Sequence, residues 1–90
     1  MTDKLLVLIT KSAATQINEA SAWWRKNRTA AQDAIADEIE RAPDILSVQP
    51  SLGTRAKHAR LSGVRRVRLS RINYFLYFRV SGGILSVLAL

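Results

Sequence analysis

The sequence predicts an α+β fold in the order β-α-α-β-β-β, with two N-terminal helices packed on one face of a mainly antiparallel sheet. Three features predict it: a short apolar run at the start, then two stretches with helical periodicity, and finally stretches in which apolar and polar residues alternate. With 90 residues, 48% of them hydrophobic, the chain is long enough for one folded domain that spans residues 1–90.

The first strand is predicted in KLLVLIT, residues 4–10, because this run is continuously apolar and too short for a typical helix. From Ser12 the spacing becomes helical, which predicts a first helix to about Asn27 with Thr10 or Ser12 as its N-cap. The buried face of this helix is expected to carry Ala13, Ile17, Ala20 and Trp24. Trp23 points about 100° away from Trp24, so we expect only one indole to be fully buried and the other to mark a partner groove.

The second helix is predicted to begin at TAAQ, in which Thr29 and Gln32 form a capping-box pattern. Its inward face is expected to carry Ala31, Ile35, Ile39 and Ala42, and its outer face is expected to be acidic, with Asp33, Asp37 and Glu40. Asp37 is placed to pair with Arg41 one turn later. Pro43 removes one helical hydrogen bond, so we expect the helix to kink there and continue through DILSV.

Residues 49–63 are rich in turn-forming and basic residues and are predicted to form a long basic loop. Three strands follow, in VRRVRLS, NYFLYFRV and ILSVLAL, and Gly82 and Gly83 form a tight turn between the last two. The second of these strands is apolar on both sides, which indicates a central position, and the first and last strands of the chain are expected to pair in parallel. Because the last strand is still apolar at Leu90, we expect the natural chain to carry a further short C-terminal tail.

Charge is distributed unevenly along the chain, whose formal net charge is +7. Residues 1–45 carry six basic and seven acidic residues, whereas the remainder carries a charge of +8 and no acidic residue. Such a field favours an anionic partner, which could be a nucleic acid, an acidic protein segment or an anionic membrane surface.

Several classes of site are excluded or disfavoured by composition. The chain has no cysteine, which excludes disulfides and thiolate sites, and its one histidine, His58, cannot build a metal site alone. Residues 5–9 are too few for a signal-peptide core or a membrane span. We therefore expect a soluble, cytoplasmic protein that uses no cofactor or metal and does not associate with a membrane.

Two segments resemble one protein superfamily: LLVLITKSAATQINEASAWW at residues 5–24 and LSGVRRVRLSRINYFLYFRVSGGILSVLAL at residues 61–90. Together they are similar to the opening strand and helix and to the closing sheet of the RelE/ParE toxins of type II toxin–antitoxin systems. RelE-like members are ribosome-dependent messenger-RNA endonucleases, whereas ParE-like members inhibit DNA gyrase and lack the nuclease residues. The resemblance thus leaves two functional classes to distinguish.

The nuclease branch carries two cationic residues at i and i+2 of a basic strand, which Arg66 and Arg68 resemble, and an arginine directly after a tyrosine in the next strand. Here Phe75 follows Tyr74, so that second feature is absent. If the chain were a nuclease, its site would consist of Arg66, Arg68, Tyr74 and Tyr77. His58, the one side chain that titrates near neutrality, is interpreted as a solvated or partner-contacting loop residue rather than a catalyst.

The ParE branch is the better match, because its members show an arginine pair opening the basic strand and a YxxYxRV-like strand after it. The matching residues here are Arg65, Arg66, Tyr74, Tyr77, Arg79, Val87-Leu88 and the Trp23-Trp24 pair. The resemblance implies a non-enzymatic toxin that causes growth arrest and plasmid stabilisation by inhibiting gyrase. It also implies a cognate ParD-like antitoxin with an acidic and apolar C-terminal segment, in a higher-order hetero-oligomer.

Fixed guanidinium groups on one sheet face suit recognition of carboxylates or phosphates. We expect Arg65, Arg66, Arg68 and Arg71 to form such a face, although arginines that merely solubilise an exposed sheet are the alternative. The full set predicted to bind the target or the antitoxin is Trp23, Arg65, Arg66, Arg68, Arg71, Tyr77 and Arg79. Phe75 and Tyr77 could instead stack nucleobases, but the chain has neither an RNP-like motif nor a glycine-rich clamp, and no sequence-specific DNA binding is expected.

Overall fold

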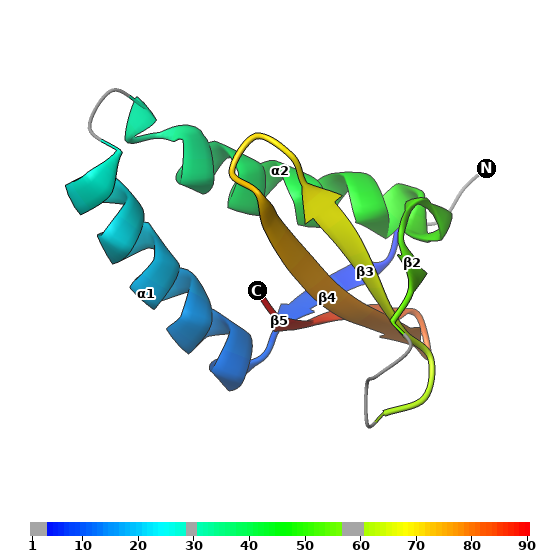
Figure 1. Cartoon of the computed structure of the whole chain (residues 1–90). Coiled ribbons are helices and arrows are strands. Elements are labelled where there is room, and N and C mark those ends of the chain that lie inside the picture. The colour runs from blue at the N-terminus through cyan, green and yellow to red at the C-terminus, as the bar shows by residue number, and fades with distance from the viewer. Residues whose placement is uncertain (1–3, 29–30, 57–60) are drawn as a thin grey trace.

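The computed structural model of the chain describes residues 4–28, 31–56 and 61–90 (Figure 1). Its elements follow one another as β1 (Leu6–Ile9), α1 (Lys11–Asn27), α2 (Ala34–Val48), the short 3-10 helix η2 (Pro50–Leu52), β2 (Thr54–Arg55), β3 (Val64–Leu69), β4 (Tyr74–Ser81) and β5 (Ile84–Ala89). The predicted α+β class is confirmed, with both helices before the main part of the sheet. Among these described residues, no helix is both long and apolar enough to cross a membrane.

The strands form one five-stranded sheet in the order β1-β5-β4-β3-β2. β1 pairs with β5 in parallel, and the other neighbours are antiparallel. The parallel pairing of the first and last strands and the central position of β4 are therefore confirmed. The prediction of a long basic loop at residues 49–63 is wrong in part, because Pro50–Leu52 form η2 and Thr54 and Arg55 pair with Arg66 and Arg65 as a short edge strand.

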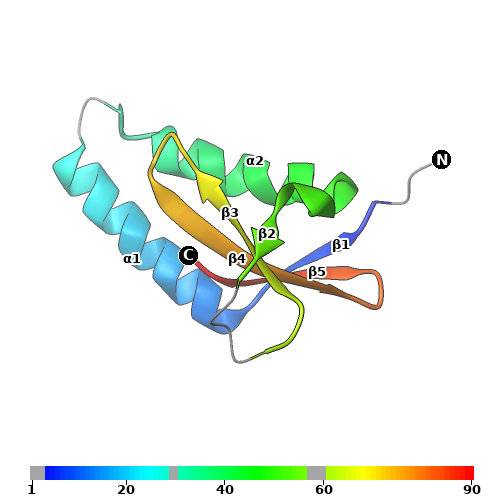
Figure 2. The same cartoon turned by 45° about the vertical axis from the view of Figure 1, so that its right-hand side comes forward.

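One hydrophobic cluster joins both helices to one face of the sheet. α1 contributes Ala13, Ala20 and Trp24, and the sheet contributes fully buried Leu76, Phe78, Leu85 and Val87. α1 and α2 lie closest together at the C-terminal end of α1 and diverge from there (Figures 1 and 2). No helix formed by residues 4–28, 31–56 or 61–90 covers the other face of the sheet (Figures 1 and 2).

The start of α1 is set by Thr10, one of the two predicted N-caps. Its Oγ1 accepts a hydrogen bond from the backbone N–H of Ala13 at 3.2 Å and donates one to the carbonyl of Val87 at 2.8 Å. One hydroxyl thus caps the helix and fixes the end of β1 against β5.

The second helix begins at Ala34, later than predicted. The indole Nε1 of Trp24 donates to the carbonyl of Ala31 at 2.7 Å, so this carbonyl is engaged by a side chain across the helix pair. Gln32 lies in a turn and Thr29 lies outside the described residues, so the capping box is not part of the observed helix start. The helix does continue past Pro43 to Val48, as predicted.

The predicted pairing of Asp37 with Arg41 is wrong. Arg41 Nη2 instead lies 2.6 Å from Oε1 of Glu38, a carboxylate that is 8% exposed, and Asp37 lies 3.6 Å from Arg71 of the β3–β4 turn. The buried carboxylate holds Arg41 on its own helix, since an unpaired buried charge is costly. Asp37 pairs instead with Arg71 and so connects α2 to the β3–β4 turn.

Candidate functional site

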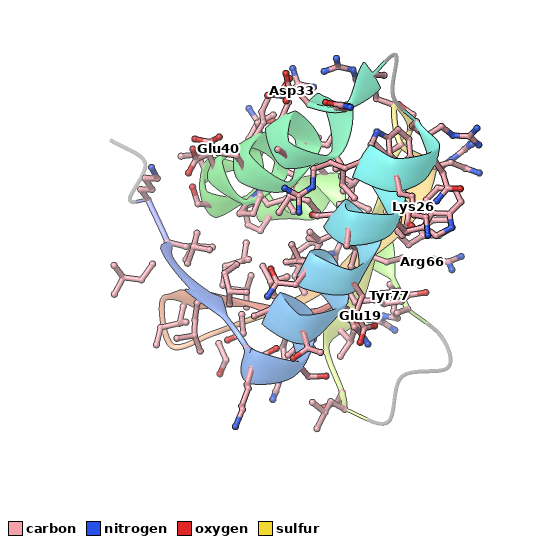
Figure 3. The ribbon with its side chains drawn as sticks, turned by 90° about the vertical axis from the view of Figure 1, so that its left-hand side faces the viewer. Glu19, Lys26, Asp33, Glu40, Arg66 and Tyr77 are labelled. Carbon is pink, nitrogen blue, oxygen red and sulfur yellow. The ribbon has the colours of Figure 1, made fainter. Side chains whose placement is uncertain are left out.

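The face of the sheet that carries no helix is cationic over β3 and β4. Alternation along β3 points Val67 and Leu69 toward the core and leaves Arg66 and Arg68 exposed on the other side, as predicted. In the cross-strand register Arg66 lies opposite Tyr77 and Arg68 opposite Phe75, so these residues share one face. We call Arg66, Arg68, Phe75, Tyr77 and Arg79 the cationic face. Figure 3 shows Arg66 and Tyr77 on one side of the molecule and Glu40 of α2 on the other.

Two arginines of the cationic face are held by neutral neighbours. The guanidinium carbon of Arg66 lies 4.4 Å from the centroid of the Phe75 ring, a cation–π distance. Arg68 Nη2 donates to Oδ1 of Asn73 at 2.8 Å. The salt bridges among the described residues involve other cations, namely Lys4, Arg41 and Arg71. The positive charge of this face is therefore positioned without being neutralised, which suits an anionic partner.

Arg65 does not belong to the cationic face, so the prediction of one shared face for all of the arginines is wrong. It lies opposite Phe78, on the core side of the sheet, and its Nε and Nη2 both donate to the carbonyl of Gly53, at 3.1 and 2.6 Å. Arg71 is in the turn after β3 and reaches toward Asp37. Arg65 thus fastens the segment before β2 to β3, while Arg71 connects the turn to α2.

The four residues of the nuclease alternative do not converge. Tyr74 lies opposite Leu69 and packs against the hydrophobic core, so it is on the other side of the sheet from Arg66 and Arg68. Tyr77 alone of the two tyrosines shares the arginine face. His58 lies outside the described residues.

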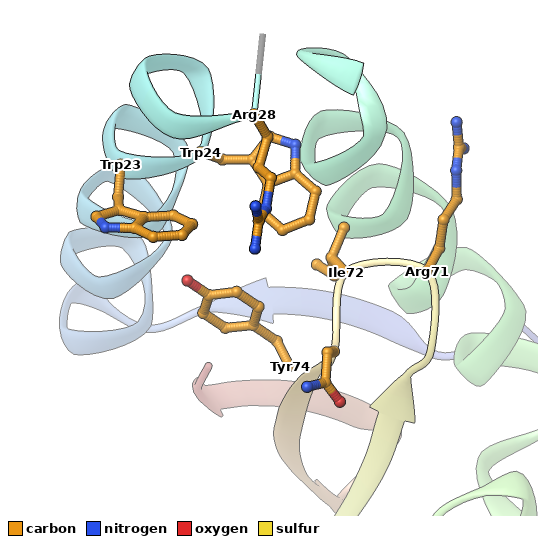
Figure 4. Close-up of a pocket in the computed structure, with 7 residues that line it drawn as sticks. Trp23, Trp24, Arg28, Arg71, Ile72 and Tyr74 are labelled. Atoms are coloured by element: carbon orange, nitrogen blue, oxygen red, sulfur yellow. The ribbon is translucent and has the colours of Figure 1, made fainter. Parts of the chain in front are cut away.

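A second feature is a cleft of about 440 Å³ between the end of α1 and the β3–β4 turn (Figure 4). We call it the aromatic cleft, and it is lined by Trp23, Trp24, Arg28, Arg71, Ile72, Asn73 and Tyr74. Trp24 is 8% exposed and Trp23 is 48% exposed, which confirms that one indole of the pair is buried and the other is not. Sequence reasoning found Trp23 and Arg71 but missed Arg28, which a spacing of four or five residues from the two tryptophans could have indicated.

The family model described as "ParE toxin of type II toxin-antitoxin system, parDE" matches residues 7–90. The chain belongs to the ParE toxin family. A solved structure titled "Chromosomal ParDE TA system from P. aeruginosa" is similar with a TM-score of 0.74 and 22% sequence identity, over 96% of this chain and 92% of that one. At this identity the likeness shows the shared fold, and the family model carries the assignment. A comparison with curated proteins gave no match.

This ParE-family toxin also has an apolar groove of about 210 Å³ between α2 and β3. Its lining is mostly aliphatic: Glu38, Arg41, Ala42, Ile45, Leu46, Leu52, Val67 and Leu69. Ile45 and Leu52 are 43% and 52% exposed, so the groove is open to solvent. The sequence does not indicate this groove, because the three residues of η2, which place Leu52, are too few to show a helical period. In the described part of the toxin no group of three or more histidine or acidic residues is placed to hold a metal ion.

Proposed function

We propose that this ParE-family toxin of a ParDE toxin–antitoxin system acts by binding, with DNA gyrase as its target, and that its antitoxin neutralises it by covering the cationic face. Family membership supports the target, because ParE toxins are generally gyrase inhibitors without enzymatic activity. Inhibition of gyrase would block DNA replication and so arrest growth. The chain would act in the cytoplasm.

The position of Tyr74, on the core side of the sheet, supports action by binding rather than by RNA cleavage. Cleavage of RNA through its 2′-hydroxyl needs a base, a cation at the phosphate and an acid at the leaving oxygen within reach of one another. Arg66 and Arg68 can supply positive charge, but arginine does not act as a base in proteins because it stays protonated. Tyr74 packs against the core on the far side of the sheet, which leaves Tyr77 as the acid–base candidate among the described residues of the cationic face. One such group does not make up the set that the reaction requires.

The antitoxin segment that fits this toxin is acidic and apolar. Carboxylates would pair with the guanidinium groups of Arg66 and Arg68, which form no salt bridge among the described residues and contact the neutral side chains of Phe75 and Asn73. Apolar side chains of the same segment would enter the apolar groove, which Val67 lines. Val67 lies between Arg66 and Arg68 in β3 but points to the opposite face of the sheet. A segment that passes around β3 at residues 67–69, beyond the two residues that β2 pairs, could therefore use both chemistries, folding as it binds. Several copies of toxin and antitoxin would form a higher-order hetero-oligomer.

Expression of the chain without its antitoxin tests the target. DNA and protein synthesis are pulse-labelled in the first minutes after induction, and the purified chain is added to a gyrase supercoiling reaction. We expect DNA synthesis to fail first and supercoiling to be inhibited. Early collapse of protein synthesis with cleaved messenger RNA, and intact supercoiling, would replace this proposal with the ribosome-dependent nuclease.

A further inference from the structure

We propose that the aromatic cleft binds a nucleoside phosphate, either as a free nucleotide or as an unpaired nucleotide of a nucleic-acid strand. The base would stack on the walls of the cleft and the phosphate would bind Arg28. This function is separate from inhibition of gyrase and does not depend on it. Four observations on the cleft support it: its aromatic walls, its cation, its amide and its size.

The walls offer aromatic faces from two elements. Trp23 lies near the C-terminal end of α1 and is 48% exposed, which is unusual for so large an apolar side chain. Tyr74, at the start of β4, contributes a half-buried ring whose hydroxyl points toward Trp23 (Figure 4). Every nucleobase has a π-face that can stack on such rings, and this is how proteins hold unpaired bases.

Arg28 supplies positive charge inside the cleft. Its guanidinium carbon lies 5.7 Å from the Trp23 ring centroid and 6.0 Å from that of Trp24, and Figure 4 shows the side chain extending between the two indoles toward Tyr74. Among the described residues, the salt bridges leave Arg28 without a carboxylate partner, and no acidic residue lines the cleft. A planar guanidinium without a carboxylate suits a phosphate, to which it can donate two parallel hydrogen bonds.

Asn73 supplies a neutral group suited to the edge of a base. Its φ of +59° is in the left-handed region, which asparagine tolerates better than most residues. Because Oδ1 accepts a hydrogen bond from Arg68 Nη2 at 2.8 Å, the orientation of the amide is set and Nδ2 remains as a donor. Such a donor matches the ring nitrogens and carbonyl oxygens that bases present on their edges.

The size of the cleft and its mixed lining favour a nucleotide over an acidic peptide. At about 440 Å³ the cleft falls in the range of small-molecule sites, which is about 300–1,000 Å³. A glutamate or aspartate side chain would satisfy Arg28 but leave both aromatic faces in water. A nucleotide would use the aromatic faces, the guanidinium and the amide together.

Fluorescence can test this directly, because the chain has two tryptophans and both line the cleft. The full chain is excited at the red edge of indole absorption and titrated with adenosine monophosphate, with a short oligothymidylate, and with ribose 5-phosphate, which lacks a base. We expect saturable quenching by the nucleotide and the oligonucleotide and little response to ribose 5-phosphate. Arg28→Gln should weaken binding at least about tenfold.

Arg25→Gln is the matched control, since it makes the same change on an exposed residue in the last turn of α1 that does not line the cleft. It should retain the affinity of the unaltered chain, and circular dichroism establishes that both variants fold. Tighter binding of the oligonucleotide than of the mononucleotide would identify a strand as the source, and the reverse would identify a free nucleotide.

Three results would overturn the proposal. The first is equal quenching by ribose 5-phosphate and the nucleotide, which would mean that the base is not bound. The second is an equal loss of affinity in both arginine variants, because that would indicate unspecific attraction to net charge. The third is quenching by an oligoglutamate peptide with none by either nucleotide probe, which would assign the cleft to a protein partner.

Discussion

The uncovered face of the sheet has a cationic end and an apolar end. Over β3 and β4 it carries Arg66 and Arg68, whereas over β1 and β5 it carries Leu6, Leu8 and Ile84, which are 71%, 54% and 39% exposed. The register continues from Arg79 through Ser86 to Leu8, so the two ends share one continuous surface. Strand alternation alone therefore does not decide which chemistry a sheet shows to solvent. β3 alternates because one of its faces is buried, whereas β1 is an edge strand and is apolar on both faces.

Phe78 lies in the central strand between the two ends, and its removal should have the largest effect on stability. Phe78 of β4 is fully buried, and a Cβ added to Gly53 would overlap its ring. Phe78→Ala should lower the free energy of unfolding by about 3–5 kcal/mol, since it opens a cavity that the packed sheet cannot fill. Urea denaturation followed by circular dichroism measures it. Val80→Ala, two residues along the same strand and 37% exposed, is the control and should cost under about 1 kcal/mol.

Charge reversal separates the cationic end from the apolar end. The double variant Arg66→Glu and Arg68→Glu should bind the antitoxin about 100-fold more weakly at low salt, because attraction to acidic side chains becomes repulsion. Isothermal titration calorimetry at two salt concentrations gives the affinity and its salt dependence. Lys11→Glu with Lys26→Glu makes the same change in net charge on exposed positions of α1. If both double variants lose affinity equally, the cationic face is not the antitoxin site.

Neighbouring arginines of β3 should differ in their effect on stability. Arg65 donates two hydrogen bonds to the Gly53 carbonyl, so Arg65→Gln should reduce the free energy of unfolding by about 1–2 kcal/mol. Arg66 is exposed and stacks on one ring, so Arg66→Gln should cost only about 0.5 kcal/mol. Thermal unfolding of the two variants side by side tests this, and equal losses would contradict the structural role assigned to Arg65.

The smallest effect on stability is expected at the apolar end. Leu6→Lys with Leu8→Lys should change the free energy of unfolding by under about 0.5 kcal/mol, because both side chains are exposed in the structure. The same change should reduce self-association of the isolated chain, since lysine on an edge strand discourages pairing with a second chain. Light scattering over a concentration series measures this. Self-association that persists unchanged in the variant would show that β1 does not mediate it.

The strands and the hairpin turn were predicted well where neighbouring residues alone determine them. β3 and β5 lie within one residue of the predicted stretches, and the Gly82-Gly83 turn has the positive φ values, +59° and +77°, that such a hairpin requires. The start of α2 was predicted too early, because Trp24 bonds the carbonyl of Ala31 from another helix. β2 was missed because two residues are too short to carry a period and gain strand geometry only by pairing with β3.

The candidate site shows the same division. By itself the sequence determined that residues after Asp44 carry only positive charge, that Arg66 and Arg68 project together from one strand, and that one of two adjacent tryptophans is exposed. These properties follow from the order of residues and from the fixed periods of strands and helices. Alternation also separates Tyr74 from Tyr77, but tertiary structure alone decided that Tyr77 is the one opposite Arg66, that Arg65 fastens Gly53, and that Arg28 meets Asn73 in one cleft. Those contacts join residues from separate elements, and their distances depend on how the helices pack on the sheet.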